Sequence, residues 1–112
     1  MKYMLLIYAS TTDEPTCTFE DWQDYEKAMH DAGVLVSGHA LQDLVTATTV
    51  QVDADGRRTV TDGPFGESRE VLGGYDVIDV GSLDEALDWA ARCPGSRDGG
   101  KVVVRPIADF GD

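Results

Sequence analysis

The stretch of the sequence best suited to chemistry is the turn Asp62-Gly63-Pro64-Phe65. Its simplest interpretation is structural, because Asp accepts backbone hydrogen bonds, Gly permits unusual φ values and Pro fixes its own φ. In the alternative interpretation, Asp62 is a carboxylate at the mouth of a pocket and Phe65 partly desolvates it. A desolvated carboxyl has a raised pKa and can act as a general base. Gly63, Pro64 and Phe65 would then border a bound ligand.

Three further residues could complete such a site. His39 follows Ser37-Gly38 at the end of an expected strand, and an acid–base pair would result if His39 and Asp62 faced each other. The plainer interpretation of His39 is a partly exposed residue at a strand end. Tyr75 is an alternative proton-transfer group. Arg105 has apolar neighbours along its strand, so its guanidinium needs either a carboxylate of the protein or an anionic ligand as partner.

No pattern in the sequence indicates a cofactor or a metal. Gly73-Gly74 and Gly99-Gly100 lack the spacing of a phosphate-binding loop, and no G-x-S-x-G nucleophile motif occurs. His30 and His39 match no metal-ligand spacing with nearby Cys or carboxylates. We therefore expect neither a bound cofactor nor a structural metal.

Composition restricts the class of protein. The 112 residues suit one domain, 1–112, and 42% of them are hydrophobic, enough for a core. The net charge of −12 disfavours direct binding to nucleic acid or to anionic membranes, both of which rely on clustered cations. The apolar run 4–8 is too short for a signal peptide, and the cysteines, Cys17 and Cys93, form no metal or redox motif. We expect a cytoplasmic protein.

Hydrophobic periodicity predicts six strands and two helices. Apolar or β-branched runs predict strands over 3–8, 35–40, 46–52, 57–61, 73–80 and 101–105. Asp55-Gly56 predicts a two-residue hairpin turn between the third and fourth strands. Helical spacing places on one face of the first helix Phe19, Trp22, Tyr25, Met29 and Ala32. The same spacing places on one face of the second helix Leu83, Ala86, Leu87 and Ala90.

Residue types also indicate where the two helices begin and where the first one ends. Thr18 with Asp21 resembles a capping box, Ser82 with Glu85 is a full one, and Gly33 suits the left-handed position after the first helix. The resulting order, β-α-β, hairpin, β-α-β, predicts an α+β sheet with both helices on one face. Strands 3–8 and 102–104 are apolar on both faces. We therefore expect a second copy of the chain to cover the face that the helices leave open, forming a homodimer.

The sequence resembles the YCII-related proteins and, within them, the DGPF-domain subfamily, over almost its whole length. The segments that carry this resemblance are 1–8, 32–35, 46–50, 61–67, 72–75, 83–90 and 104–106. The resemblance implies a ferredoxin-like, dimeric α+β barrel. YCII-like proteins are suspected enzymes because a His–Asp pair lies in a pocket. At the positions that match this pair, our sequence has Trp22 in place of the histidine and Asp43 near the aspartate. The resemblance also implies a link to extracytoplasmic-function sigma factors.

Three functional hypotheses follow from these patterns. The first is a dimeric module that binds or senses a small molecule and is connected with a sigma factor. The second is a small enzyme without a cofactor, of the isomerase or lyase kind. In it, Asp62 with His39 or Tyr75 would move protons on an aromatic or lactone-like substrate. The third is a structural interaction domain.

Overall fold

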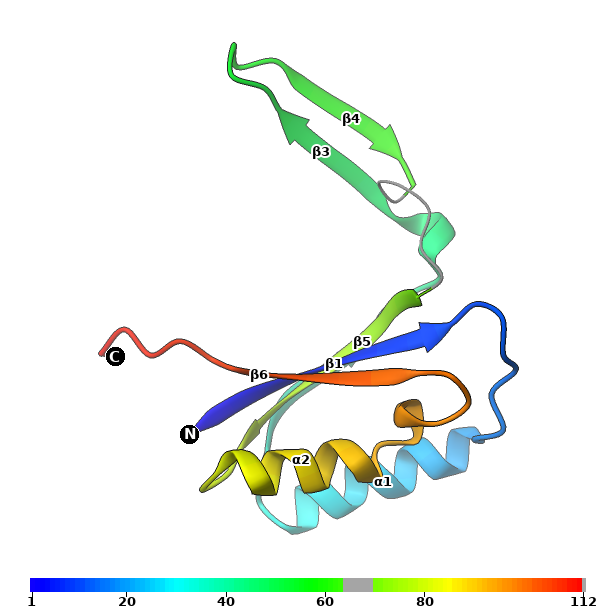
Figure 1. Ribbon diagram of the computed structural model, residues 1–112, viewed down its shortest axis with the longest axis vertical. Coiled ribbons are helices and arrows are strands. Elements are labelled where there is room, and N and C mark those ends of the chain that lie inside the picture. Colours follow the sequence, from blue (N-terminus) through cyan, green and yellow to red (C-terminus); the bar gives the residue numbers. More distant parts are fainter. Residues whose placement is uncertain (64–69, 112) are drawn as a thin grey trace.

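The computed structural model describes residues 1–63 and 70–111, and their elements follow the expected order (Figure 1). The strands are β1 (Lys2–Ser10), β2 (Leu35–Ala40), β3 (Thr48–Val52), β4 (Arg58–Asp62), β5 (Glu70–Asp79) and β6 (Lys101–Pro106). The helices are α1 (Phe19–Asp31) and α2 (Leu83–Arg92). Two short 3-10 turns complete the described elements: η1 (Leu44–Thr46) lies between β2 and β3, and η2 (Pro94–Ser96) lies between α2 and β6.

Four strands form one antiparallel sheet in the order β2-β5-β1-β6, while β3 and β4 pair only with each other. With α1 following β1 and α2 following β5, this order is ferredoxin-like, with the β3–β4 hairpin inserted after β2. Both helices lie on the same side of the sheet (Figure 1). The α+β fold with its helices on one face is therefore confirmed.

The core lies between the helices and one face of the sheet. Alternate residues of a strand point to opposite faces, so Tyr3 and Leu5 of β1 share the helix-covered face with Ile78 of β5. All three are buried. The helices complete this core with Tyr25, Met29, Ala86 and Ala90. Met4 and Leu6 point to the other face and are only half-buried.

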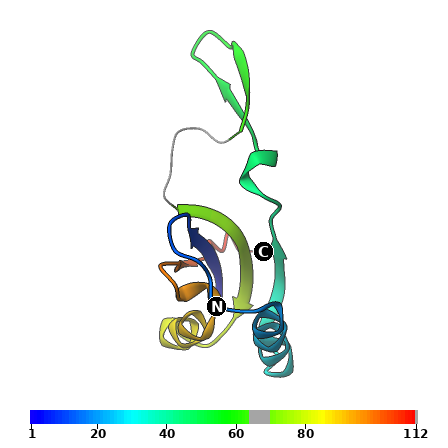
Figure 2. The same ribbon diagram turned by 90° about the vertical axis from the view of Figure 1, so that its right-hand side faces the viewer.

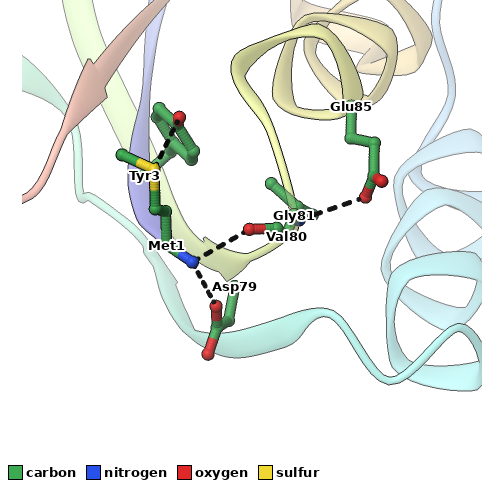
Figure 3. A network of polar contacts seen from close by, with 6 residues as sticks. All are labelled: Met1, Tyr3, Asp79, Val80, Gly81 and Glu85. Carbon is green, nitrogen blue, oxygen red and sulfur yellow. Dashed lines mark hydrogen bonds and ion pairs between the residues drawn. The ribbon is translucent and has the colours of Figure 1, made fainter.

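The predicted helix caps are present with one difference. The hydroxyl of Thr18 accepts from the Asp21 amide, and the Asp21 carboxylate accepts from the Thr18 amide, completing a capping box. At α2, Ser82 accepts from the Glu85 amide at 3.2 Å. The Glu85 carboxylate, however, accepts from Gly81, one residue before the expected donor (Figure 3). Helix α2 therefore has the cap but not the full capping box.

The predicted apolar faces of the helices are wider than the buried ones. Phe19 is 77% exposed at the start of α1, and Ala32 is exposed after its end. Leu83 and Leu87 of α2 are also largely exposed. The sheet contacts only a narrow strip of each helix, centred on Tyr25 and Met29 in α1 and on Ala86 and Ala90 in α2.

The hairpin loop also differs from its prediction. The Asp53 amide donates to the Arg57 carbonyl, which leaves a three-residue loop. Gly56 alone in this loop has a positive φ, +82°, and its amide donates to Asp53. This is the pattern of a type I turn followed by a left-handed residue, in place of a two-residue primed turn. The hairpin extends away from the helices as an arm (Figures 1 and 2).

A polar network connects the start of β1 to the segment after β5 (Figure 3). The Met1 ammonium donates to the Asp79 carboxylate at 3.1 Å and to the Val80 carbonyl at 3.0 Å. Because Val80 leads into α2, this network links the start of β1 to the end of β5 beside the second helix.

Candidate functional site

A pocket of about 570 Å³ opens between α1, the ends of β1 and β2, and the η2 segment. This volume is within the range of small-molecule sites. Its apolar walls include Ile7, Pro15, Trp22, Tyr25, Met29 and Pro94. The pocket is also lined by carboxyl groups, and one of them, that of Asp76, lies on the helix-covered face of the sheet.

The position of Asp76 follows from the register of β5. It pairs with Leu5 of β1 on one side and with Gly38 of β2 on the other. Its side chain therefore points to the same face as the buried Leu5 and Ile78. Gly38 makes the space for it, because a Cβ on Gly38 would lie 2.1 Å from Asp76 Oδ1.

Burial and a like charge act together on this carboxyl. Burial of Asp76 raises its pKa to about 6, and repulsion from Glu26 of α1 contributes to the rise. Two weaker acids lie close enough to interact with Asp76. Burial raises the pKa of Tyr25, and it raises the pKa of the Cys93 thiol to about 11. The Tyr25 hydroxyl donates to the Trp89 carbonyl at 2.8 Å. Tyr25 and Cys93 are therefore neutral at pH 7, where Asp76 is mostly ionised.

Trp22 forms part of the wall opposite the sheet. Its indole lies against Gly95 of η2, where an added Cβ would be 3.0 Å from the ring and 2.5 Å from Ile7. Phe19 stands exposed at the rim, and Cys17 lines the pocket while its thiol donates to the Pro94 carbonyl. An apolar molecule in the pocket would therefore contact aromatic rings on the α1 side.

His39 and Tyr75, two of the residues singled out from the sequence, lie together. They are paired in register, and their rings are 5.7 Å apart. Both border the pocket, but alternation along the strands directs their side chains to the face opposite Asp76. The carboxyl of Asp76 thus lies on the helix-covered face of the sheet, whereas the rings of His39 and Tyr75 lie on the open face.

Asp62 lies elsewhere, at the end of β4, where it is exposed and pairs with Thr48. Asp62 and His39 belong to different sheets. Gly63 has a φ of +93°, donates to the Ala47 carbonyl and accepts from the Thr49 hydroxyl. Pro64 and Phe65 lie outside the described residues. These contacts place Asp62 and Gly63 at the base of the arm.

Arg105 and Asp43 complete the set of residues considered from the sequence. Arg105 is exposed on β6, opposite Met4, so its side chain points to the open face of the sheet. Asp43 caps η1 through the Leu44 amide and is exposed. Trp22 does line the pocket.

Sequence reasoning missed Asp76, although a signal for it exists. Apolar periodicity predicts the strand 73–80 but does not distinguish Asp76, the charged residue between Tyr75 and Val77, from its neighbours. An aspartate at a core-facing position of a strand is unusual, since burial of an ionised carboxyl costs free energy. Among residues 1–63 and 70–111, no group of three or more His, Cys, Asp or Glu side chains is arranged to hold a metal ion.

No helix in the described part of the chain is long and apolar enough to cross a membrane.

Comparison with known proteins gives a family match and a curated relative. The sequence profile of the YCII-related domain matches residues 1–111. An uncharacterised protein of Rhizobium meliloti (strain 1021), R00369, is 34% identical over 116 residues, which cover 96% of our chain and 93% of that protein.

The raised pKa of Asp76 predicts a pH-dependent stability difference between Asp76→Asn and the wild type. The ordinary pKa is 3.8 and the folded value is about 6, so the folded state binds this proton more tightly. The wild type therefore loses stability as the pH rises from about 4 to 6. Above pH 6, Asp76→Asn should be more stable by at most about 3 kcal/mol. Urea denaturation from pH 4 to 7.5 should show this difference disappearing at pH 4. A difference independent of pH, or one as large in the exposed Asp88→Asn control, would contradict the assignment.

The close contact at Gly38 predicts a steric effect of Gly38→Ala. Its new Cβ would lie 2.1 Å from Asp76 Oδ1 and 3.1 Å from the Tyr75 carbonyl oxygen. We expect a loss of about 1–3 kcal/mol in unfolding free energy, measured by urea denaturation. Gly73→Ala is the matched control, since its nearest contact is at 3.9 Å. The loss should shrink in an Asp76→Ala background, because one clashing group is gone. Equal losses for Gly38→Ala in both backgrounds would show that Asp76 does not occupy this space.

Proposed function

Because the chain belongs to the YCII-related domain family, whose matched relative is uncharacterised, we propose a function from the site itself: reversible binding of a small, largely apolar molecule. The observation that carries this proposal is the pocket of about 570 Å³ that contains the half-buried Asp76. Pockets for small molecules combine apolar walls with a few polar groups that fix the orientation of the ligand. Trp22 and Tyr25 provide the wall, and Asp76 provides the polar group.

A second candidate function is acid–base catalysis in the same pocket. A pKa of about 6 for Asp76 lies close to the operating pH, which suits a general acid or base. This favours Asp76 over Asp62 as the proton-transfer residue, because Asp62 is exposed on the arm and is not among the pocket residues. An isomerase or lyase acting on an aromatic or lactone-like substrate would use Asp76 in this way.

We also propose that the protein is a homodimer, with a second copy covering the open face of the sheet to form a barrel. Each copy leaves Met4, Leu6 and Tyr75 of this face only half-buried and Val103 exposed. The radius of gyration, 16.2 Å, exceeds the value of about 13 Å for a compact domain of similar length. The excess reflects the arm, which extends beyond the body of the molecule (Figure 2).

The arm supports the same proposal. A two-stranded hairpin is marginally stable by itself in water. One face of the arm has an apolar centre formed by Val50, Val52 and Val60, which are exposed by 57%, 64% and 54%, with Arg58 and Asp62 at its two ends. The other face has Thr49, Gln51, Thr59 and Thr61. Burial of the valine face against a second copy would supply the stabilisation that the hairpin lacks.

The resemblance to DGPF-domain proteins extends the proposal to sensing. Ligand binding would then alter contact with an extracytoplasmic-function sigma factor. The cysteines, both free, suit the reducing cytoplasm, where we place this activity. This connection would be supported if a sigma factor co-purified with the protein and the amount recovered changed when the pocket was filled. Failure of any sigma factor to co-purify from the same cells would oppose it.

The binding proposal predicts saturable uptake of a neutral apolar probe. N-phenyl-1-naphthylamine should gain fluorescence on entering the pocket. Cys17→Trp should weaken its affinity about tenfold or more, equivalent to about 1.4 kcal/mol, because an indole at this lining position occupies the space. Leu87→Trp adds the same ring to the exposed side of α2 and should leave the affinity unchanged. Unsaturable binding, or equal affinity in both variants, would count against the pocket.

The dimer proposal predicts opposite results for neighbouring residues of β4. Sedimentation equilibrium should show a dimer of the wild type at micromolar concentration. Val60→Asp places a charge on the valine face and should weaken dimerisation at least about tenfold. Thr59→Asp places the same charge on the opposite face and should have little effect. A monomeric wild type would refute the dimer, and a Val60→Asp variant that dimerises as well as the wild type would remove the arm from the interface.

A further inference from the structure

The charges around the pocket are almost all negative. The carboxylates that line it are Asp13, Glu26, Asp76 and Asp98, whereas Arg97 is the one Lys or Arg among the described lining residues. Asp98 is fixed as an anion, because the amide and hydroxyl of Thr16 donate to it at 2.8 and 2.9 Å and lower its pKa. With a net charge of −12 for the chain, the pocket repels anions.

Asp76 has space for a partner on its pocket side. Within the described residues, burial and repulsion from Glu26 account for its electrostatic environment, and no hydrogen-bond donor contributes to it. A half-buried carboxylate without a donor is costly, and a charge-assisted hydrogen bond would offset this cost. The ligand group that best complements the Asp76 carboxylate is therefore a positively charged hydrogen-bond donor.

The aromatic residues around the pocket suit the same ligand. Trp22 and Tyr25 line it from α1, and Phe19 stands at its rim. The faces of aromatic rings attract cations, most strongly that of Trp, and they also cover apolar groups. Aromatic walls beside an unpaired carboxylate therefore favour a molecule with an apolar body and a positively charged end.

We infer that the pocket binds a small organic amine, with its ammonium group against Asp76 and its apolar body against Trp22. This inference rests on the proposed binding function and specifies the ligand class. The binding step is a charge-assisted hydrogen bond from the ammonium to the carboxylate, with no covalent change.

The pH dependence follows from the groups around Asp76. Glu26 and Tyr25 face it from α1, Cys93 approaches from the end of α2, and β1 and β2 contribute the uncharged Leu5 and Gly38. Tyr25 and Cys93 stay neutral between pH 5 and 7.5. Asp76 becomes protonated below about pH 6, so the preference for an amine should decrease there.

Three ligands that share a phenyl ring test this inference: phenethylamine, phenethyl alcohol and 3-phenylpropanoate. Affinities are measured by ligand-observed NMR in 0.15 M salt. At pH 7.5 we expect phenethylamine to bind about tenfold or more tightly than the alcohol, and 3-phenylpropanoate to bind most weakly. Asp76→Asn should reduce the preference for the amine to less than about threefold, because the ammonium group loses its anionic partner. The exposed Asp88→Asn, which changes the net charge equally, should retain the full preference.

Each alternative outcome has a distinct meaning. Equal affinity for amine and alcohol, or tighter binding of 3-phenylpropanoate, would overturn the ligand class while leaving the binding function intact. A preference that survives Asp76→Asn would overturn the role of Asp76. If none of the three phenyl ligands binds while N-phenyl-1-naphthylamine still does, the amine inference would also be overturned. Failure of the naphthylamine as well would refute the proposed function.

Discussion

The alternation of side chains along β5 is the constraint on which both the core and the pocket depend. It directs Ile78 and Asp76 to the helix-covered face and Tyr75 to the open face. A one-residue shift of register would expose Ile78 and remove the carboxyl from the pocket. This register is held by the pairing of Asp76 with Leu5 of β1 on one side and with Gly38 of β2 on the other. The same hydrogen-bonded ladder therefore secures the fold and sets the chemistry of the pocket.

Much of the fold could be predicted from local patterns. The order of elements, the caps at Thr18 and Ser82, and the positive φ of Gly33 were all indicated by residue types at fixed spacing. The hairpin loop was longer than predicted, because the Asp53 carboxylate accepts from the amides of Asp55 and Arg57 and stabilises a three-residue loop. Such side-chain contacts within a loop compete with the turn that a dipeptide favours.

The site was harder to predict because it depends on which face each strand residue occupies. His39 and Asp76 are separated widely in the sequence, yet they border one pocket from opposite faces of neighbouring strands. Asp76 belongs to no recognisable motif: it is one of three charged residues of β5, and the other two, Glu70 and Asp79, lie at the ends of the strand. The unusual feature of Asp76 is its burial, which becomes visible only when Leu5 and Gly38 are placed beside it.

The protein thus combines a half-buried carboxyl, aromatic walls and an acidic lining in one pocket, with the β3–β4 arm and an open sheet face directed elsewhere (Figures 1 and 2). The most direct test of the role of Asp76 is an NMR titration of its side-chain carboxyl carbon. A midpoint near pH 6 is expected, because burial and Glu26 both oppose ionisation. A midpoint at or below about pH 4, the ordinary range for an aspartate, would show that Asp76 is solvated and would contradict the account.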